Sequence, residues 1–215
     1  CMQLFQNNGN ILSPIERDSF KLERDIQSLV ETNMEVIFGI EFVSTELTVG
    51  EFRLDTLAFD ERNNSFVIVE YKKGHSYSVV DQGYSYLSVM LNNKAEFILE
   101  YNEKTDKKLK RTDIDWSSSK VIFVSPSFNT YQKNSVNFRD VPFELWEIKR
   151  FDSELVSFEQ CKSSSTESIE KLSMGDNSSV ISKVSSQIKV LSEEDHTSKL
   201  SDLIKPIWTR LREKL

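Results

Sequence analysis

The order of hydrophobic and polar positions predicts a layered α/β domain in the first part of the chain. A polar lead-in over residues 2–17 precedes a helical repeat. Two segments then alternate like strands, and a nearly continuous apolar run follows them. The predicted elements occupy residues 18–38, 41–49, 53–59, 66–72, 78–92, 121–124, 143–151 and 155–158. Their order is helix, three strands, helix and strand, followed by a final strand pair, which favours a mixed α/β plan.

The composition changes after residue 161. Residues 162–192 are rich in serine and lack aromatic side chains, which is typical of a linker. Helical spacing returns after them, and Pro206 is expected to kink or split that helix. The apolar positions of this repeat are Leu200, Leu203, Ile204, Ile207, Trp208 and Leu211. We therefore expect a domain at 1–161, a linker at 162–192 and a C-terminal helix at 193–215.

Composition and cysteine content indicate a soluble cytoplasmic protein. Of 215 residues, 38% are hydrophobic and 28% are charged, which is ordinary for a globular protein. No apolar run approaches the ~20 residues of a membrane span, and no signal-peptide pattern is present. The two cysteines, Cys1 and Cys161, make no disulfide framework. We expect a reducing compartment and no membrane partner.

The net charge of −7 argues against broad, non-specific binding to nucleic acid, which needs a basic surface. It does not exclude a nuclease, because acidic clusters that hold metals are local and basic patches can be local too. The candidate patches are the Lys72–Lys73 pair and the lysine-rich segment 104–111. The second is expected to be a solvated loop, since charge runs usually are.

A glutamate and a lysine stand at the end of the third predicted strand. Alternation along the strand places Glu70 and Lys72 on one face and Tyr71 on the other. A buried acid–lysine pair at the end of an apolar strand is costly unless something compensates its charge. Such a triplet is therefore a candidate catalytic site.

The hairpin between the second and third strands determines what faces Glu70. If Phe59 pairs with Phe66, then Asp55 pairs with Glu70. Two carboxylates directly opposite each other repel. Such a pair persists when a divalent cation bridges it, and oxygen ligands of this kind suit Mg²⁺ or Mn²⁺.

This arrangement predicts phosphodiester chemistry. A cation held by Asp55 and Glu70, with the backbone carbonyl of Tyr71 within reach, would polarise a phosphate oxygen and acidify a bound water. Lys72 beside it can orient or deprotonate that water and offset charge in the transition state.

Glu23 adds a further candidate acid on the first predicted helix. It falls at the edge of the apolar stripe, whereas Glu31 and Glu35 fall on the opposite, wet face. One interpretation is an additional carboxylate at the metal site. The other is a salt bridge or a helix-start acid that the helix dipole favours. Both stay open.

Gln82 and Tyr86 are four residues apart, so they project from one face of the predicted helix. Glutamine can bond a base or phosphate, and tyrosine can stack on a nucleotide. The alternative is ordinary helix packing around a close approach at Gly83. The position of Gln82 ten residues after Lys72 favours contact with nucleic acid.

A second Glu-x-Lys triplet occurs at Glu147 and Lys149, with Asp140 upstream. It lacks an upstream antiparallel strand that carries the acid and a helix after it, so the copy at 70–72 is preferred. His75 and His196 have no partner at ligand spacing and are expected to be solvated. No glycine-rich phosphate loop, zinc pattern or serine elbow is present.

At these residues the chain resembles the PD-(D/E)XK nuclease superfamily, and within it the RecB-like branch with a Gln-x-x-x-Tyr motif. The resemblance covers residues 18–150. It is carried by Glu23, by Asp55 in Phe-Arg-Leu-Asp-Thr, by Glu70 and Lys72 in Val-Glu-Tyr-Lys-Lys, and by Gln82 with Tyr86. Leu54 stands where the superfamily often has proline. The stretch from Arg53 to Tyr86 is similar to an uncharacterised prokaryotic group.

The resemblance implies a restriction-endonuclease-like core of α-β-β-β-α-β order, with a mixed central sheet flanked by helices. It also implies a Mg²⁺ site from Asp55 and Glu70, and DNA as the substrate, with Gln82, Tyr86 and Lys73 on the nucleic acid. The C-terminal helix is similar to the start of a small appended domain. The leading hypothesis is a Mg²⁺-dependent deoxyribonuclease. The rival is a catalytically silent protein of the same fold that binds nucleic acid or another protein. A homodimer is left open.

Overall fold

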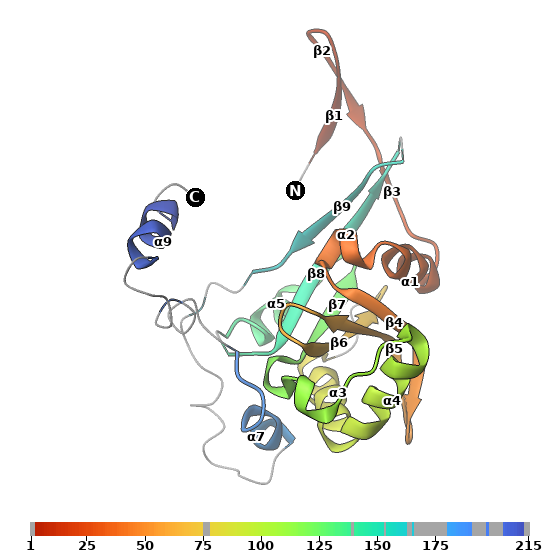
Figure 1. The fold of residues 1–215 in the computed structure, drawn as a ribbon. Coiled ribbons are helices and arrows are strands. Elements are labelled where there is room, and N and C mark those ends of the chain that lie inside the picture. Colours follow the sequence, from red (N-terminus) through yellow and green to blue (C-terminus); the bar gives the residue numbers. More distant parts are fainter. Residues whose placement is uncertain are drawn as a thin grey trace.

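A mixed seven-stranded sheet forms the centre of the computed structural model (Figure 1). The structure describes residues 3–74, 78–138, 140–152, 154–162, 165, 180–190, 197 and 204–212. The strands lie in the order β3, β8, β7, β6, β5 and β4, and β9 also pairs with β8. Their bounds are β3 Arg17–Asp18, β4 Glu41–Val49, β5 Phe52–Asp60, β6 Ser65–Tyr71, β7 Lys120–Ser125, β8 Phe143–Phe151 and β9 Val156–Gln160.

The directions of the strands make the sheet mixed. Strands β4, β5 and β6 form an antiparallel meander, whereas β6, β7 and β8 run parallel to one another. The carboxyl ends of these three parallel strands therefore lie at the same end of the sheet. The predicted mixed sheet, and the order of helix, three strands, helix and strand, are confirmed.

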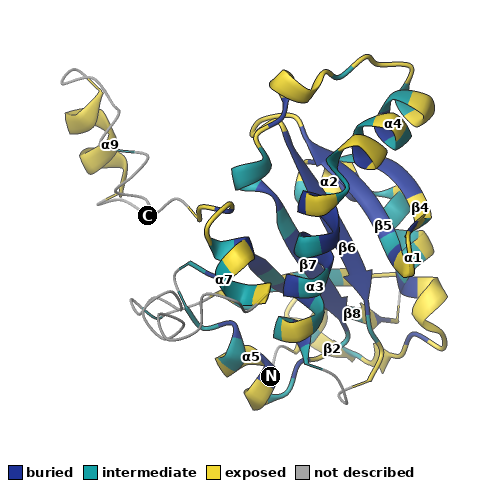
Figure 2. Ribbon diagram, turned by 90° about the horizontal axis from the view of Figure 1, so that it is seen from below, coloured by how far each residue is buried: buried dark blue, intermediate teal, exposed yellow. Residues whose placement is uncertain are grey.

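Helices cover both faces of the sheet, and Figure 2 shows the buried strands between them. Helices α1 and α2 lie on one face, and α3 and α4 on the other. The helices are α1 Glu23–Thr32, α2 Met34–Phe38, α3 Val79–Asn92, α4 Lys94–Thr105, α5 Thr130–Ser135, α7 Val180–Ser185 and α9 Lys205–Arg212, with 3₁₀ turns η1 Arg111–Asp113 and η2 Trp116–Ser118. None of the helices in the described ranges is long and apolar enough to cross a membrane.

Strand β6 is buried on both faces, as its apolar run predicts. Phe66 and Ile68 belong to the core under α3, and Val67 and Val69 belong to the core under α1. This alternation determines which face each side chain at the end of the strand reaches. Glu70 lies on the α3 side, and Tyr71 lies on the α1 side.

The first helix departs from the prediction. It begins at Glu23 rather than Asp18 and is interrupted at Asn33, where α2 starts on a new axis. Val36, an apolar residue inside the predicted helix, is 88% exposed. The break rotates the residues after Asn33 away from the positions that a continuous helix would give them.

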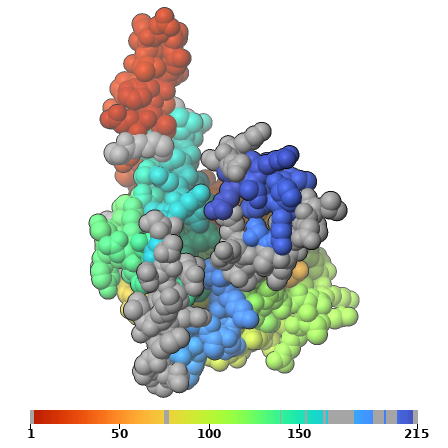
Figure 3. Space-filling view, turned by 90° about the vertical axis from the view of Figure 1, so that its left-hand side faces the viewer, coloured from red at the N-terminus to blue at the C-terminus, as the bar shows by residue number. Residues whose placement is uncertain are grey.

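The polar lead-in contains two strands that the pattern did not predict. Strands β1 (Leu4–Asn8) and β2 (Ile11–Ile15) form an antiparallel hairpin that stands away from the rest of the molecule (Figures 1 and 3). Gly9 turns the hairpin with a φ of +70°, a conformation that only glycine adopts readily. Strand β3 follows and pairs with the end of β8.

The C-terminal part is described only in segments. Residues 180–190, inside the predicted linker, include α7, and Val184 and Ile188 are buried in the core on the α3 side. Pro206 does not kink the last helix, because it stands in the first turn of α9, where a missing N–H costs nothing. The following lie outside the described residues: Cys1, His75, His196, Leu200, Leu203, most of the predicted linker and both ends of the predicted C-terminal helix.

Candidate functional site

The predicted register of the β5–β6 hairpin is confirmed. Phe59 pairs with Phe66, and Thr56 pairs with Val69. The next position along the hairpin brings Asp55 beside the end of β6, where the backbone N–H of Tyr71 donates to Asp55 Oδ2 at 3.0 Å. The side chain of Asp55 is therefore held at the carboxyl end of β6, next to Glu70.

Glu70 is 2% exposed, and one of its oxygens is tightly bound. Its Oε1 accepts hydrogen bonds from Lys72 Nζ at 2.6 Å, Gln82 Nε2 at 2.8 Å and Tyr86 Oη at 3.1 Å. Gln82 also donates to the oxygen of Tyr86 at 2.7 Å. The expectation that Gln82 and Tyr86 share one helical face is met, and that face points at Glu70.

Helix α3 is oriented by its ends and by its packing. Ser78 is the N-cap, and its hydroxyl accepts from the N–H of Asp81 at 3.2 Å.

Burial raises the pKa of the Tyr86 phenol, and the nearby charge of Glu70 raises it further. The phenol therefore stays protonated and donates to Glu70 at any physiological pH.

The second oxygen of Glu70 has no hydrogen-bond partner among the described residues. Its Oε2 is buried and receives no hydrogen bond from any residue in the described parts of the chain. Burial raises the pKa of Glu70, and the charge of Asp55 raises it further, although Lys72 opposes both effects. An uncompensated buried carboxylate oxygen costs free energy, and a cation is the partner that would remove this cost.

The pKa of Asp55 is also raised. Burial raises the pKa of Asp55, and the N–H of Tyr71 and the charge of Lys72 offset that rise only in part. Across the described ranges no group of three or more His, Cys, Asp or Glu side chains is arranged to hold a metal ion. Two carboxylates fit a hard cation such as Mg²⁺, which commonly takes one or two carboxylates and completes its shell with water and phosphate oxygens.

Glu23 lies at the edge of this site and not inside it. Its side chain is exposed, and Oε2 accepts from the backbone N–H of Lys73 at 2.8 Å. The ammonium of Lys73 donates to the backbone oxygen of Lys21. The charge of Glu23 also contributes to the raised pKa of Asp55, so the two acids are within electrostatic reach. Glu23 thus connects the start of α1 to the end of β6.

The pattern analysis missed Gln27. Its Nε2 donates to Glu31 Oε1 and Thr45 Oγ1, each at 3.0 Å, and to the backbone oxygen of Asp55 at 3.3 Å. Gln27 therefore connects α1 to the strand that carries Asp55. The spacing of Glu23, Gln27 and Glu31, four residues apart along one helix, is the signal that could have found it.

The prediction that Glu31 faces water is wrong. Its Oε1 accepts from the buried hydroxyl of Thr56 at 2.5 Å as well as from Gln27. Thr56 Oγ1 also lies 3.2 Å from the phenol oxygen of Tyr71. These contacts form a polar layer behind Asp55, on the α1 side of the sheet.

An open cleft adjoins the site on the α3 side. Its volume is about 530 Å³. It is lined by Phe52, Lys72, Ser78, Asp81, Gln82, Ser85 and Tyr86. Lys72 therefore borders the space through which a substrate would reach Glu70.

The second Glu-x-Lys triplet has a different environment. Glu147 Oε1 accepts from Lys133 at 2.7 Å and from the N–H of Phe128 at 3.2 Å, and Oε2 lies 3.1 Å from Lys149 Nζ. Burial alone would raise the pKa of Glu147, but the bonds from Lys133 and Lys149 outweigh it and the pKa is lowered. Both oxygens are satisfied, which is typical of a structural ion pair.

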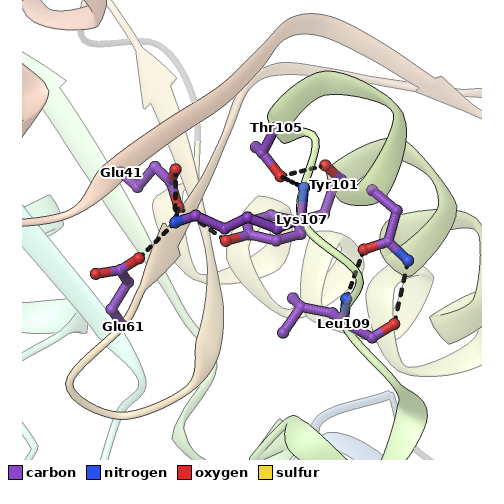
Figure 4. Close-up of polar contacts among 7 residues, drawn as sticks. Glu41, Glu61, Tyr101, Thr105, Lys107 and Leu109 are labelled. Carbon is purple, nitrogen blue, oxygen red and sulfur yellow. Dashed lines mark hydrogen bonds and ion pairs between the residues drawn. The ribbon is translucent and has the colours of Figure 1, made fainter.

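The lysine-rich segment also has a structural role at Lys107 (Figure 4). Lys107 Nζ lies 2.9 Å from Glu41 Oε2 and 2.5 Å from Glu61 Oε1, and Glu41 also accepts from the phenol of Tyr101. The lysine thus connects the end of α4 to β4 and to the β5–β6 loop. These ion pairs occupy the ammonium group of Lys107.

A comparison with known proteins finds a relative in sequence. No family model matches the chain. An uncharacterized protein of Haemophilus influenzae is 44% identical over 208 residues, an alignment that covers 96% of this chain and 68% of the relative.

Solved structures show looser likenesses. EndoMS in complex with dsDNA is 19% identical, with a TM-score of 0.39 over 60% of this chain and 47% of the other. A repair endonuclease from Pyrococcus abyssi is 18% identical, with a TM-score of 0.31 over 55% and 44%. SfsA of Pyrococcus furiosus, in complex with Ca²⁺, is 11% identical, with a TM-score of 0.32 over 69% and 75%. Structural similarities this weak do not show that the chain shares the activity of any of these proteins.

Proposed function

The chain belongs to the same family as the uncharacterized Haemophilus influenzae protein, and we propose that it is a metal-dependent nuclease that hydrolyses phosphodiester bonds in DNA. The observation that carries this proposal is the buried Oε2 of Glu70, which accepts no hydrogen bond from the described residues and lies beside Asp55 and Lys72. The residues match the pattern of the PD-(D/E)XK superfamily and of its branch with a Gln-x-x-x-Tyr motif, and we assign the family to that branch.

Asp55 and Glu70 hold the cation in this proposal, and the backbone carbonyl of Tyr71 is a third ligand. We expect Mg²⁺ or Mn²⁺, since the ligands are all oxygen atoms. The bound cation would polarise a phosphate oxygen and lower the pKa of water. The raised pKa values of Asp55 and Glu70 support this assignment, because nearby positive charge stabilises the ionised carboxylates.

Lys72 assists the attack of water on phosphorus. Its ammonium group lies at the cleft and donates to Glu70, so it can also donate to the attacking water or to a phosphate oxygen. This contact orients the water and offsets the negative charge that develops on the phosphate as the phosphorus–oxygen bond breaks.

Gln82 and Tyr86 act first on Glu70. Both donate to Oε1, which leaves Oε2, without a hydrogen bond from any described residue, available to a cation. We assign them as positioning residues, and their contact with nucleic acid stays a prediction. Glu23 and Lys73 border the site, where Glu23 supports the end of β6 and Lys73 is expected to contact the DNA backbone.

The test is a calorimetric titration of Mg²⁺ and Mn²⁺ into the full chain, with and without DNA. We expect binding to the wild type, loss of binding in Asp55→Ala and Glu70→Gln, and unchanged binding in Glu147→Gln, which alters the other triplet. Cleavage of labelled duplex and single-stranded DNA should fall about 100-fold or more in the two site variants. A wild type that binds no metal in the presence of DNA, and cuts neither substrate, would refute the proposal.

A catalytically silent nuclease fold is the second candidate. It is favoured by the three hydrogen bonds to Glu70 Oε1, which stabilise that oxygen without a cation. In that case the chain binds nucleic acid or another protein without cutting. Duplex binding by the wild type that neither Mg²⁺ nor Asp55→Ala changes would support this second function.

A further inference from the structure

The β1–β2 hairpin projects from the same end of the sheet as the candidate site. Strand β3, directly after the hairpin, pairs Arg17 with Phe151 at the carboxyl end of β8. Strands β6 and β8 both run parallel to β7, so the carboxyl end of β8 and Glu70 lie toward one end of the sheet. Figures 1 and 3 show the hairpin extending beyond the body at that end. Strands of five residues give it a reach of about 17 Å.

The hairpin is polar without being charged. Residues 3–15 contain no Asp, Glu, Lys, Arg or His, in a chain with a net charge of −7. Four exposed amide side chains lie toward its tip, and none makes a hydrogen bond to any residue that the structure describes. They are Gln6, Asn7, Asn8 and Asn10. Each amide can donate and accept at once, and no carboxylate on this hairpin would repel a polyanion.

Both faces of the hairpin are uncovered. The exposed fraction is 47% for Phe5, 71% for Ile11 and 60% for Leu12. The register places Asn8 and Ile11 on one face and Asn7 and Leu12 on the other, so each face presents an amide beside an apolar side chain. An isolated two-stranded hairpin is only marginally stable in water, so a partner that encloses both faces is expected.

We propose that the β1–β2 hairpin enters the major groove of double-stranded DNA bound at the Asp55–Glu70 site, an inference that rests on the proposed nuclease function. The major groove, about 12 Å wide, admits a two-stranded ribbon. The amides of Asn7 and Asn8 match the donor and acceptor of an adenine edge, and Ile11 and Leu12 match the methyl group of thymine.

A second copy of the chain fits the hairpin less well. Pro14, the fourth of the five residues of β2, pairs with Phe5 and has no N–H to offer a further strand. A proline on an edge strand discourages the addition of another strand, which is how two such hairpins would otherwise associate. The amide-rich tip also leaves polar groups that a purely apolar contact between copies would not satisfy.

The experiment measures binding of an A·T-rich duplex by fluorescence anisotropy, with the full chain carrying Glu70→Gln so that the DNA is not cut. The hairpin variant adds Asn7→Ala, Asn8→Ala and Asn10→Ala and keeps the Gly9 turn. The matched control adds Asn92→Ala, Asn134→Ala and Gln187→Ala, which remove three exposed amides from the body. Circular dichroism checks that both variants keep the fold.

We expect the hairpin variant to bind the duplex about tenfold more weakly or worse, and the control to bind normally. The slope of log K against log salt should stay the same in the hairpin variant, because amides neutralise no phosphates. A duplex with 7-deazaadenine, which lacks the N7 acceptor, should weaken binding by the parent chain and have no further effect on the hairpin variant.

Equal binding by the hairpin variant and its parent would overturn the inference. A variant that changes a dimer into a monomer in analytical ultracentrifugation, with duplex binding unchanged, would also overturn it and would identify the hairpin as a contact between copies. The two proposals fail differently. If wild type with Mg²⁺ cuts the duplex and the Asn7, Asn8 and Asn10 changes leave that rate unaltered, only the hairpin inference falls. If wild type neither binds nor cuts DNA, the nuclease function falls and the inference with it.

Discussion

Glu70 and Glu147 each begin a Glu-x-Lys triplet, but their surroundings shift their pKa values in opposite directions. Burial dominates at Glu70, where one oxygen has no donor among the described residues, and its pKa is raised. Bonds from Lys133 and Lys149 dominate at Glu147, and its pKa is lowered. A bound cation would therefore stabilise the ionised carboxylate of Glu70. The carboxylate of Glu147 is already stabilised by two lysines.

This contrast predicts opposite pH dependences of stability in metal-free protein. The folded state raises the pKa of Glu70, so its ionisation costs stability, and the free energy of unfolding falls as pH rises above its ordinary value of 4.5. The folded state lowers the pKa of Glu147, so this residue stabilises the fold above 4.5 and the effect is lost as pH falls below it.

The measurement is chemical denaturation in EDTA from about pH 4 to about pH 8. Relative to wild type at neutral pH, Glu70→Gln should unfold with a higher free energy and Glu147→Gln with a lower one. Added Mg²⁺ should stabilise wild type and leave Glu70→Gln unchanged. If both variants raised, or both lowered, the free energy of unfolding, the opposite pKa shifts assigned to Glu70 and Glu147 would be contradicted.

At the scale of elements, the site depends on how closely α3 approaches the sheet. A Cβ atom added at Gly83 would lie 2.5 Å from the ring of Phe143, which is buried against Tyr84 and near Phe123. The glycine thus permits the close packing that the sequence suggested. The same packing brings Gln82 and Tyr86, one residue before and three after it, to Glu70.

Gly83→Ala should therefore destabilise the protein, although alanine favours a helix. Moving the ring of Phe143 in a packed core costs about 1–3 kcal/mol, more than the gain in helix propensity. Ser85→Ala, in the same helix with no such contact, is the control and should change the free energy of unfolding by less than about 0.5 kcal/mol. Urea denaturation of both variants is the measurement, and an equal effect would show that the close approach carries no energy.

At the scale of the whole molecule, the net charge of −7 opposes DNA binding unless charge at the site is compensated. Asp55 and Glu70 lie close together, and the single ammonium group of Lys72 offsets only part of their combined charge in metal-free protein, so negative charge remains where DNA phosphate would bind. Glu147 carries the same formal charge but is paired with lysines. The charge at the Asp55–Glu70 site, and not the net charge of the protein, should therefore control the affinity for DNA.

Glu70→Gln should bind duplex DNA in EDTA about threefold to tenfold more tightly than wild type, because it removes a repulsion at the site. Glu147→Gln makes the same change in net charge and should not tighten binding. Added Ca²⁺ should bring wild type to the affinity of Glu70→Gln. Anisotropy at fixed salt measures all three, and equal tightening by both variants would assign the effect to net charge alone.

Much of the fold and of the site follows from short-range pattern. Strand β6 is identified by its apolar run, and the pairing of Phe59 with Phe66 follows from the length of the hairpin loop, because one residue of slip would exchange the faces. The same register brings Asp55 to Glu70. The spacing of Gln82 and Tyr86 determines their common face, since a helix repeats every ~3.6 residues.

The tertiary structure decided what these side chains contact. Nothing local to Gln27 indicates the backbone oxygen of Asp55, 28 residues away, and nothing local to Glu31 indicates the hydroxyl of Thr56. The sequence pattern also did not predict the break at Asn33 or the pairing of β1 with β2, because each depends on contacts or turns that outweigh a weak local pattern. The sequence by itself determined which groups carry the chemistry and on which strand or helix they lie. Long-range packing decided that one oxygen of Glu70 has no partner among the described residues and that the hairpin stands away from the body, because burial and pairing depend on neighbours that are distant along the chain.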